Sequence, residues 1–330
     1  MSSAGCVEII GRSRGLTRAL ELAERFARTP LPILLVGATG TGKDVFARRI
    51  HEASERRGRF VPVNCGALPR EMVESLLFGH RRGAFTGAVE TVAGFVEAAD
   101  CGTLFLDELS SLPPDAQVKL LRVLEASEVA RLGEITARPV SFRVVASAQD
   151  DLRGLVEAGG FRLDLYERVA GVVLELAPLR ERPEDIIPLA EHFAGLQGRC
   201  LEPGAVAILL NYEWPGNVRE LRTAMERAEF LSENLTLSPR AIAEAIALGT
   251  PRSRPGLSGS GLMAWKVGDQ SQPHELVLMC RDHNWDVRRT AAALGIGCST
   301  LYRRLRRLGI SLRPLRSRTE ASGNSPRILT

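Results

Sequence analysis

A glycine-rich loop directly after a short apolar run restricts the possible folds more than any other feature of this sequence. The apolar run covers residues 33–36, and the loop that follows has the pattern GxxxxGK: Gly37, Ala38, Thr39, Gly40, Thr41, Gly42 and Lys43. In such a loop the backbone N–H groups surround phosphates, the helix that follows adds a partial positive charge, and the lysine reaches the β and γ oxygens. The pattern indicates a nucleotide site on a strand–loop–helix unit.

Two carboxylates at the end of a second apolar run supply the other half of such a site. Residues 104–106 are apolar, and Asp107 and Glu108 follow them. Asp107 is placed to hold Mg²⁺, directly or through water, and Glu108 to polarise an attacking water. An acidic helix cap after a core strand is the structural alternative, and a kinase is a second one. With the loop upstream, the pair favours hydrolysis of ATP with Mg²⁺ as cofactor.

The periodicity of the chain predicts an α/β fold with a parallel sheet core. Short apolar runs alternate with amphipathic segments from residue 9 to about residue 177. The expected strands are residues 33–36, 60–63, 103–106, 142–146 and 172–176. From residue 183 to residue 248 the β-like runs stop and helical patterns take over, broken at residues 214–216. We therefore expect a helical lid after the sheet.

The charge of the chain is unevenly distributed. Residues 251–330 hold fourteen Lys and Arg against five Asp and Glu, an excess of nine positive charges, and because the whole chain carries +4 the remainder carries −5. A basic end suggests contact with a polyanion, and a solubilising tail is the alternative. The six cysteines show no CxxC spacing, which favours reduced thiols over a disulfide framework or a zinc site. No apolar run approaches the ~20 residues of a membrane helix, so we expect a cytoplasmic protein without membrane contact.

A six-residue string connects these features to a family. Residues 83–88 read Gly83, Ala84, Phe85, Thr86, Gly87 and Ala88. GAFTGA is the signature of sigma-54-dependent transcription activators, and the chain resembles that family from Ile9 to Ile310; an ordinary glycine-rich surface loop is the alternative for the string alone. In the family this loop lies at the pore of an AAA+ ring and touches sigma-54. The resemblance assigns that contact to residues 83–88.

Further positions carry over by the same resemblance. Asn64 matches the residue that restrains the catalytic glutamate, and Arg162 and Arg168 match the arginine fingers that reach the γ-phosphate of a neighbouring subunit. Arg219, in WPGNVREL, matches the second sensor in the lid.

The chain also departs from the family at the nucleotide site. It has Ala38-Thr39 where Glu-Ser is common, Asp44 where the phosphate loop commonly ends in Glu, and Ala148-Gln149 where the first sensor is usually Thr-Asn. Asp44 also differs from the Ser or Thr that helps to hold Mg²⁺ in many phosphate loops. Gln149 retains an amide donor on a longer side chain. These changes bear on the rate of hydrolysis more than on nucleotide binding.

Residues 286–310 resemble the Fis-type helix-turn-helix of the same family. Gly295 permits the turn, and the second helix would begin at Ser299 and present its first residues to the major groove. Double-stranded DNA would be contacted by Ser299, Thr300, Arg303, Arg304, Arg306 and Arg307. A basic amphipathic helix without DNA function is the alternative. The motif implies a dimer on a palindromic upstream site.

Together these expectations define a domain plan. It consists of an AAA+ α/β nucleotide-binding subdomain (1–180), a helical lid (181–248), a flexible linker (249–271), an all-α helix-turn-helix domain (272–312) and a polar tail (313–330).

The resemblance also implies partners and a mechanism. Dimers would assemble into a hexamer that hydrolyses ATP and remodels the closed complex of the sigma-54 RNA polymerase holoenzyme. Only eight residues precede Ile9, so we expect control by a regulatory protein or a paralogous subunit in place of a receiver or ligand-sensing domain. Two rivals remain: a DNA-binding regulator with a nucleotide pocket but no working motor, and an AAA+ remodeller with a different target.

Overall fold

The computed structural model describes residues 8–149, 152–196, 198–232 and 234–249. The chain divides into two units at residue 252, and every described residue belongs to the first of them. The residues expected to form the linker beyond residue 249, the helix-turn-helix and the tail lie outside the described residues, so their boundaries stay predictions.

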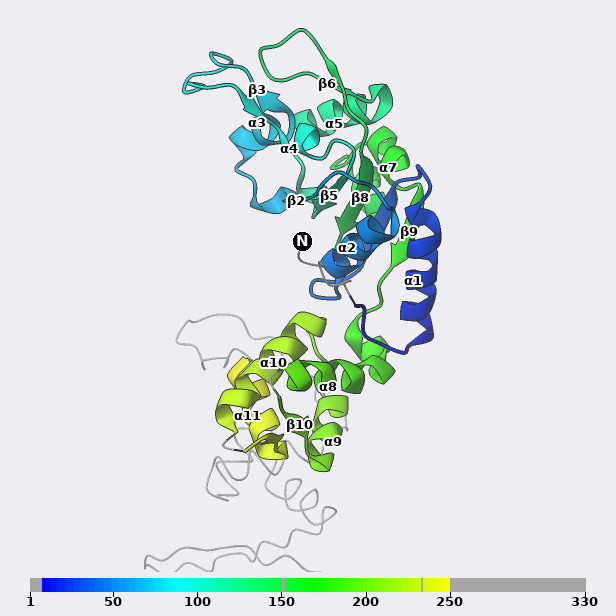
Figure 1. Cartoon of the computed structure of the whole chain (residues 1–330), viewed down its shortest axis with the longest axis vertical. Coiled ribbons are helices and arrows are strands. Elements are labelled where there is room, and N and C mark those ends of the chain that lie inside the picture. Colours follow the sequence, from blue (N-terminus) through cyan, green and yellow to red (C-terminus); the bar gives the residue numbers. More distant parts are fainter. Residues whose placement is uncertain (1–7, 150–151, 197, 233, 250–330) are drawn as a thin grey trace, which may run out of the picture. The chain divides into compact units, whose positions relative to one another are not determined.

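A five-stranded parallel sheet is the centre of the described unit (Figure 1). Its strands in spatial order are β2 (Phe60–Asn64), β5 (Thr103–Asp107), β8 (Arg143–Ala148), β1 (Ile33–Val36) and β9 (Val172–Glu175). All four neighbouring pairs run parallel. The five expected strands are therefore all present, with ends that differ from the sequence estimate by up to two residues, and the carboxyl ends of β1, β5 and β8 lead into the nucleotide motifs.

Alternate residues of the central strands β1, β5 and β8 contribute to two separate hydrophobic cores, as the pleat of a strand requires. On one side Ile33, Leu35 and Val145 pack with helices α1 (Arg14–Ala27) and α2 (Lys43–Ala53). Helix α1 buries Leu16, Ala19, Ala23 and Ala27, a spacing of three and four residues that keeps one face against the sheet.

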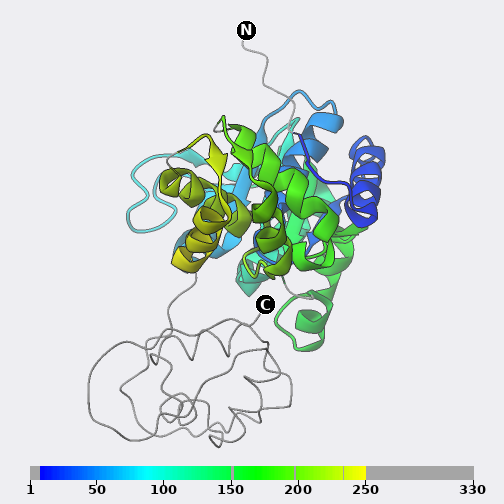
Figure 2. The ribbon, with the colours of Figure 1, turned by 90° about the horizontal axis from the view of Figure 1, so that it is seen from below.

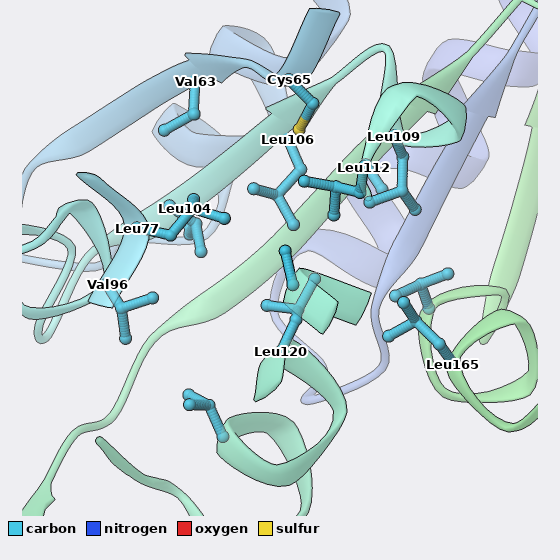
Figure 3. Close-up of a cluster of buried hydrophobic side chains, with 14 of the residues drawn as sticks. Val63, Cys65, Leu77, Val96, Leu104, Leu106, Leu109, Leu112, Leu120 and Leu165 are labelled. Atoms are coloured by element: carbon cyan, nitrogen blue, oxygen red, sulfur yellow. The ribbon is translucent and has the colours of Figure 1, made fainter. Parts of the chain in front are cut away.

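The opposite face of the sheet carries the larger core. Leu104 and Leu106 of β5 point toward Leu120, and Cys65 lies beside Leu106 (Figure 3). The helices on this side are α3 (Val73–Phe78), α4 (Phe95–Ala98), α5 (Pro114–Ala126), α6 (Leu152–Glu157) and α7 (Leu163–Val169). Because β5 is buried on both faces, its sequence is a continuous apolar run rather than an alternating one.

Two short hairpins project together from the α/β unit (Figure 1). The first joins β3 (Gly79–His80) to β4 (Val92–Ala93), and the second joins β6 (Glu128–Val129) to β7 (Arg138–Pro139). They meet where the Arg81 N–H donates to the Leu132 carbonyl at 2.9 Å and the Leu132 N–H donates to the Gly79 carbonyl at 3.0 Å.

The lid is a bundle of four helices among the described residues, shown from below in Figure 2. They are α8 (Ile186–Leu196), α9 (Pro203–Asn211), α10 (Asn217–Leu231) and α11 (Pro239–Gly249), packed around the buried Trp214. The expectation that β-structure stops at residue 183 was wrong in one detail. A parallel pair, β10 (Cys200–Leu201) and β11 (Thr236–Leu237), joins two connections of the lid, and two residues are too short to show a period of two.

Short 3₁₀ turns complete the described unit. They cover Cys65–Ala67, Arg70–Met72, Leu109–Ser111, Leu179–Glu181 and Pro183–Asp185. None of the described helices combines the length and the apolar character that crossing a bilayer requires.

Candidate nucleotide site and loop of residues 83–88

The phosphate loop connects β1 to α2 and needs glycine at positions where other chains come close. Gly37 has φ +156°, and a Cβ there would lie 2.5 Å from the Leu176 carbonyl oxygen. At Gly40, with φ +79°, a Cβ would lie 2.3 Å from the carbonyl oxygen of Gly216 in the lid. These two glycines let the loop pass directly beneath the neighbouring backbone. Asp44 stands exposed in the first turn of α2, where a carboxylate interacts favourably with the helix dipole.

Lys43 begins α2 and is buried with its ammonium turned back over the loop. Its Nζ donates to the Gly37 carbonyl at 2.7 Å and to the Ala38 carbonyl at 3.1 Å. Burial lowers the pKa of Lys43, and the carboxylates of Asp107 and Glu108 act against that shift. The lysine charge is thus compensated by the two residues that the sequence assigned to the same site.

Asp107 and Glu108 end β5 and share a partner on the neighbouring strand. Ser147 of β8, whose side chain is fully buried, donates its hydroxyl hydrogen to Asp107 Oδ1. Ser147 Oγ in turn accepts the Glu108 N–H at 3.2 Å. Glu108 has φ +54°, a left-handed conformation that a non-glycine residue adopts at a cost of about 1 kcal/mol. Ser147 therefore fixes the positions of both acidic residues. The sequence did not indicate this role, because a serine inside an apolar strand belongs to no recognisable motif.

The Gln149 side chain lies between Glu108, at the end of β5, and Thr39 of the phosphate loop. Its Nε2 donates to Glu108 Oε1 at 2.9 Å, and its Oε1 accepts the Thr39 hydroxyl at 2.6 Å. Asn64, at the end of β2, instead uses its Oδ1 to accept the Ala67 N–H at 3.1 Å. Glu108 comes close to this turn, because a Cβ on Gly66 would lie 2.3 Å from Glu108 Oε2 and 3.4 Å from Asn64 Oδ1.

The lid closes over the loop through the start of α10. Asn217 is buried, with Oδ1 accepting the Leu179 N–H at 2.7 Å and Nδ2 donating to the Thr39 carbonyl at 2.9 Å. The Arg219 N–H donates to the Gly40 carbonyl at 3.3 Å, and the charge of Arg219 contributes to lowering the pKa of Lys43. Arg182 donates to the Thr41 carbonyl at 2.9 Å from a buried position. Contacts from Asn217 and Arg182 were not expected from the sequence.

The two expected arginine fingers lie at α7, exposed to solvent. Arg162 makes two hydrogen bonds to Asp164, at 3.0 and 2.6 Å, and Arg168 donates to the Leu124 carbonyl at 2.7 Å. Within the described residues, neither guanidinium contacts the phosphate loop, Asp107 or Glu108 of its own chain. The structure therefore does not bring these arginines to the site that the other residues form.

Residues 83–88 form the tip of the first hairpin. Gly83 and Gly87 have φ of +81° and +102°, and the Gly83 N–H donates to the Ala88 carbonyl at 2.8 Å. Phe85 is 43% exposed and meets the His80 ring edge-on at 5.0 Å between centroids. Thr86 is also exposed, whereas Ala84 is half-buried and Ala88 is buried. The tip thus presents one aromatic ring and one hydroxyl to solvent.

Comparison with known proteins agrees with this arrangement. The family model described as "Sigma-54 interaction domain" matches residues 9–175, the "AAA+ ATPase lid domain" model matches residues 180–257, and the "Bacterial regulatory protein, Fis family" model matches residues 281–308.

Individual relatives are similar over most of the chain. The DNA-binding transcriptional activator HyfR of Escherichia coli (strain K12) is 41% identical over 334 residues, which is 95% of this chain and 49% of HyfR. The sigma54-dependent transcriptional regulator SfnR of Pseudomonas fluorescens (strain Pf0-1) is 47% identical over 219 residues, which is 64% of this chain and 60% of SfnR.

A solved structure has a similar fold. NtrX from Brucella abortus, crystallised in complex with ATP, superposes with a TM-score of 0.65 at 30% sequence identity, covering 92% of this chain and 69% of that one. The chain spans about half to two thirds of the length of the curated relatives it matches. By its AAA+ fold, its nucleotide motifs and the match over residues 9–175, the chain belongs to the family of sigma-54-dependent transcriptional regulators.

Proposed function

We propose that this chain activates transcription by hydrolysing ATP in an oligomeric ring and remodelling the sigma-54 RNA polymerase closed complex. The convergence of Lys43, Asp107 and Glu108 at the carboxyl edge of one sheet carries the proposal, because phosphate binding, metal binding and activation of water all need that edge. Acting on RNA polymerase would place the protein in the cytoplasm.

The residues present fit ATP with Mg²⁺. Among the described residues, the buried Lys43 ammonium donates to two loop carbonyls, so entering phosphate oxygens would replace weaker acceptors. Asp107 offers a carboxylate oxygen, the ligand type that Mg²⁺ prefers, and phosphates supply the remaining ligands in sites of this kind. Bound Mg²⁺ would neutralise charge that develops on the phosphates.

Glu108 is the residue that would take a proton from the attacking water. Its left-handed backbone and the bond from its N–H to Ser147 turn the side chain away from the apolar core. Arg219 and the backbone of Gly40 join the lid to the loop, so that a change in the loop is passed to α10. In this proposal Arg219 is the second sensor and Gln149 stands at the first sensor. Asn64, whose Oδ1 accepts the Ala67 N–H in this structure, would restrain Glu108 only after its side chain turns toward the carboxylate.

Assembly would complete the site. Arg162 and Arg168 are exposed and lack contact with their own phosphate loop, so we assign them to the γ-phosphate of the adjacent subunit. To reach the phosphate, Arg162 must first break its ion pair with Asp164. Breaking this pair costs little, because an exposed ion pair contributes only ~0–1 kcal/mol.

The exposed loop of residues 83–88 would transmit hydrolysis to sigma-54. Phe85 supplies an apolar contact and Thr86 a hydroxyl, and the hairpin that carries them is bonded to the neighbouring loop through Leu132. Residues 299–307 would bind upstream DNA as a dimer, in line with the Fis-family match at residues 281–308. A regulatory protein or a paralogous subunit is the proposed means of control.

Steady-state ATP hydrolysis measured against protein concentration tests the proposal. Specific activity should rise with concentration, since each site needs a neighbour, and Glu108→Gln should abolish it while leaving nucleotide binding intact. A Phe85→Ala variant should still hydrolyse ATP but fail to activate transcription in vitro from a sigma-54 promoter.

A DNA-binding regulator without a motor is the second candidate, and the departures at Asp44 and Gln149 favour it. Absence of hydrolysis at every concentration, with intact nucleotide binding, would favour this candidate or a ring that needs a second kind of subunit, and would refute a motor built from this chain alone. Hydrolysis without any effect of Phe85→Ala on transcription would instead refute the coupling role of the loop and favour a remodeller with another target.

A further inference from the structure

A continuous chain of hydrogen bonds joins Glu108 to the phosphate loop through one side chain. The Thr39 hydroxyl donates to Gln149 Oε1 at 2.6 Å, and Gln149 Nε2 donates to Glu108 Oε1 at 2.9 Å. Thr39 is fixed from the other side by Asn217, which donates to its carbonyl at 2.9 Å. The carboxylate is therefore connected, in three steps, to the start of helix α10 in the lid.

The residue expected to restrain Glu108 is engaged elsewhere. Asn64 Oδ1 accepts the Ala67 N–H at 3.1 Å and closes the turn after β2. Within the described residues no hydrogen bond joins Asn64 to Glu108. The side-chain amide that contacts the carboxylate here is that of Gln149.

The length of Gln149 matters, since its amide contacts two partners at once. An amide group has separate donor and acceptor atoms, so one glutamine can accept from Thr39 and donate to Glu108. Asparagine is one methylene shorter, a difference of about 1.5 Å along the side chain. From the same backbone position it would reach one partner at most, because a stretch of that size breaks a hydrogen bond.

We propose that Gln149 is a positioning residue that couples the orientation of Glu108 to the position of Thr39 in the phosphate loop. This inference rests on the proposed function, since Glu108 is oriented for a reaction only if the chain hydrolyses ATP. Phosphate entry would shift Thr39 and, through the two bonds of Gln149, the carboxylate that activates water. The pairing of Thr39 with Gln149 replaces the Ser and Asn that the family commonly has at these two positions.

Hydrolysis kinetics of the full chain at saturating protein concentration test the coupling. Gln149→Leu is expected to lower kcat by roughly tenfold to a hundredfold and to change KM by less than about threefold, because a misplaced base affects the chemical step more than binding. Thr39→Val should lower kcat, whereas Thr39→Ser, which keeps the hydroxyl, should retain it. Both side chains are exposed, so these variants should fold.

Two comparisons are decisive. The double variant Thr39→Val, Gln149→Leu should be no slower than Gln149→Leu alone, because the Thr39 bond acts only through Gln149. Gln149→Asn should be at least as slow as Thr39→Val, because asparagine keeps one of the two bonds at most, although it is the usual residue of the family. Additive losses in the double variant, or full activity of Gln149→Asn, would overturn the coupling.

Failure of the coupling is distinguishable from failure of the proposed function. Wild-type turnover that depends on Glu108, together with additive losses, refutes the coupling alone. If the wild-type chain binds a fluorescent ATP analogue but never turns over ATP, a motor built from this chain alone and the positioning role of Gln149 in it are both refuted.

Discussion

Single buried polar residues hold the nucleotide site together. Lys43, Ser147 and Asn217 are each at most 7% exposed. Lys43 donates to carbonyls of its own phosphate loop, whereas Ser147 and Asn217 bond to segments distant in the sequence. A buried polar group costs free energy when it loses its partner, so a substitution at such a position affects both stability and geometry. Two predictions belong to this scale.

Ser147→Ala should impair catalysis more than its conservative size suggests. The variant removes the hydroxyl that donates to Asp107 and leaves the Glu108 N–H without its acceptor. We expect kcat to fall by about tenfold and the free energy of unfolding by about 1–3 kcal/mol. Hydrolysis assays and urea denaturation measure the two effects. Ser141→Ala, at an exposed serine, is the control, and equal behaviour of both variants would contradict the role of Ser147.

Cys65 should be the least reactive of the described cysteines. Burial, and then the charges of Asp107 and Glu108, raise the pKa of its thiol from 9.0 to about 12, whereas Cys101 and Cys200 are exposed. Three pKa units correspond to about a thousandfold less thiolate at neutral pH. Timed alkylation followed by mass spectrometry should label Cys65 last in the folded chain and at a similar rate in urea. Labelling of Cys65 as fast as Cys101 without urea would be evidence against this burial.

The same shift predicts how stability depends on pH. Because the folded pKa of Cys65 lies above the unfolded value, the folded state binds this proton more tightly. The stability that the folded state gains from this tighter proton binding is fully present below about pH 9 and is lost as the pH rises toward 12.

At the scale of elements, one arginine ties α1 to the sheet. Arg143 begins β8, is 3% exposed, and donates to the carbonyl oxygens of Phe26 at 2.8 Å, Leu31 at 3.2 Å and Thr29. A helix end leaves its last carbonyls without partners, and this guanidinium supplies donors to the end of α1 and to the turn that leads into β1. Burial is the main cause that lowers the pKa of Arg143 to about 10, and the charge of Arg56 adds to it.

Arg143→Leu should therefore destabilise the described unit by about 3 kcal/mol, since the substitution removes the guanidinium donors of the Thr29 and Leu31 carbonyls, whereas the Phe26 carbonyl keeps the Thr29 N–H. The midpoint of urea unfolding measures this loss. Arg28→Leu is the matched control at the same end of α1, because the Arg28–Glu55 pair is 70% and 69% exposed and contributes ~0–1 kcal/mol. Similar midpoints for the two variants would show that Arg143 is not a structural tie.

At the scale of the whole molecule, charge separates two proposed tasks. Residues 251–330 carry an excess of nine positive charges and the rest carries −5, so DNA should attract the carboxyl-terminal part and not the ATPase body.

Arg306→Ala should lower the slope of log affinity against log salt by about 0.9, the value expected for one lost phosphate contact on duplex DNA. The loss in affinity should be similar on specific and unrelated sequences, because phosphate contacts carry little base information. Fluorescence anisotropy of labelled duplexes at several salt concentrations measures both quantities. An unchanged slope would remove Arg306 from the phosphate contacts.

Much of the fold follows from local patterns that sequence alone displays. The five strands of the sheet are short apolar runs bounded by turns, and β1 and β5 lead into motifs that predict phosphate and metal binding. Because such runs and motifs are local, their order along the chain was sufficient to predict the α/β core, the lid and the family. The short pairs β3–β4, β6–β7 and β10–β11 were missed, because two-residue strands are defined by their partners alone.

The sequence by itself determined the kind of site, whereas the tertiary structure decided which residues hold it in place. Lys43, Asp107 and Glu108 could be assigned from motifs, because each motif is contiguous. Ser147, and the pairing of Gln149 with Thr39, join residues 40 or 110 positions apart. Such contacts depend on strand order and on how the lid meets the loop, and no local pattern encodes those distances.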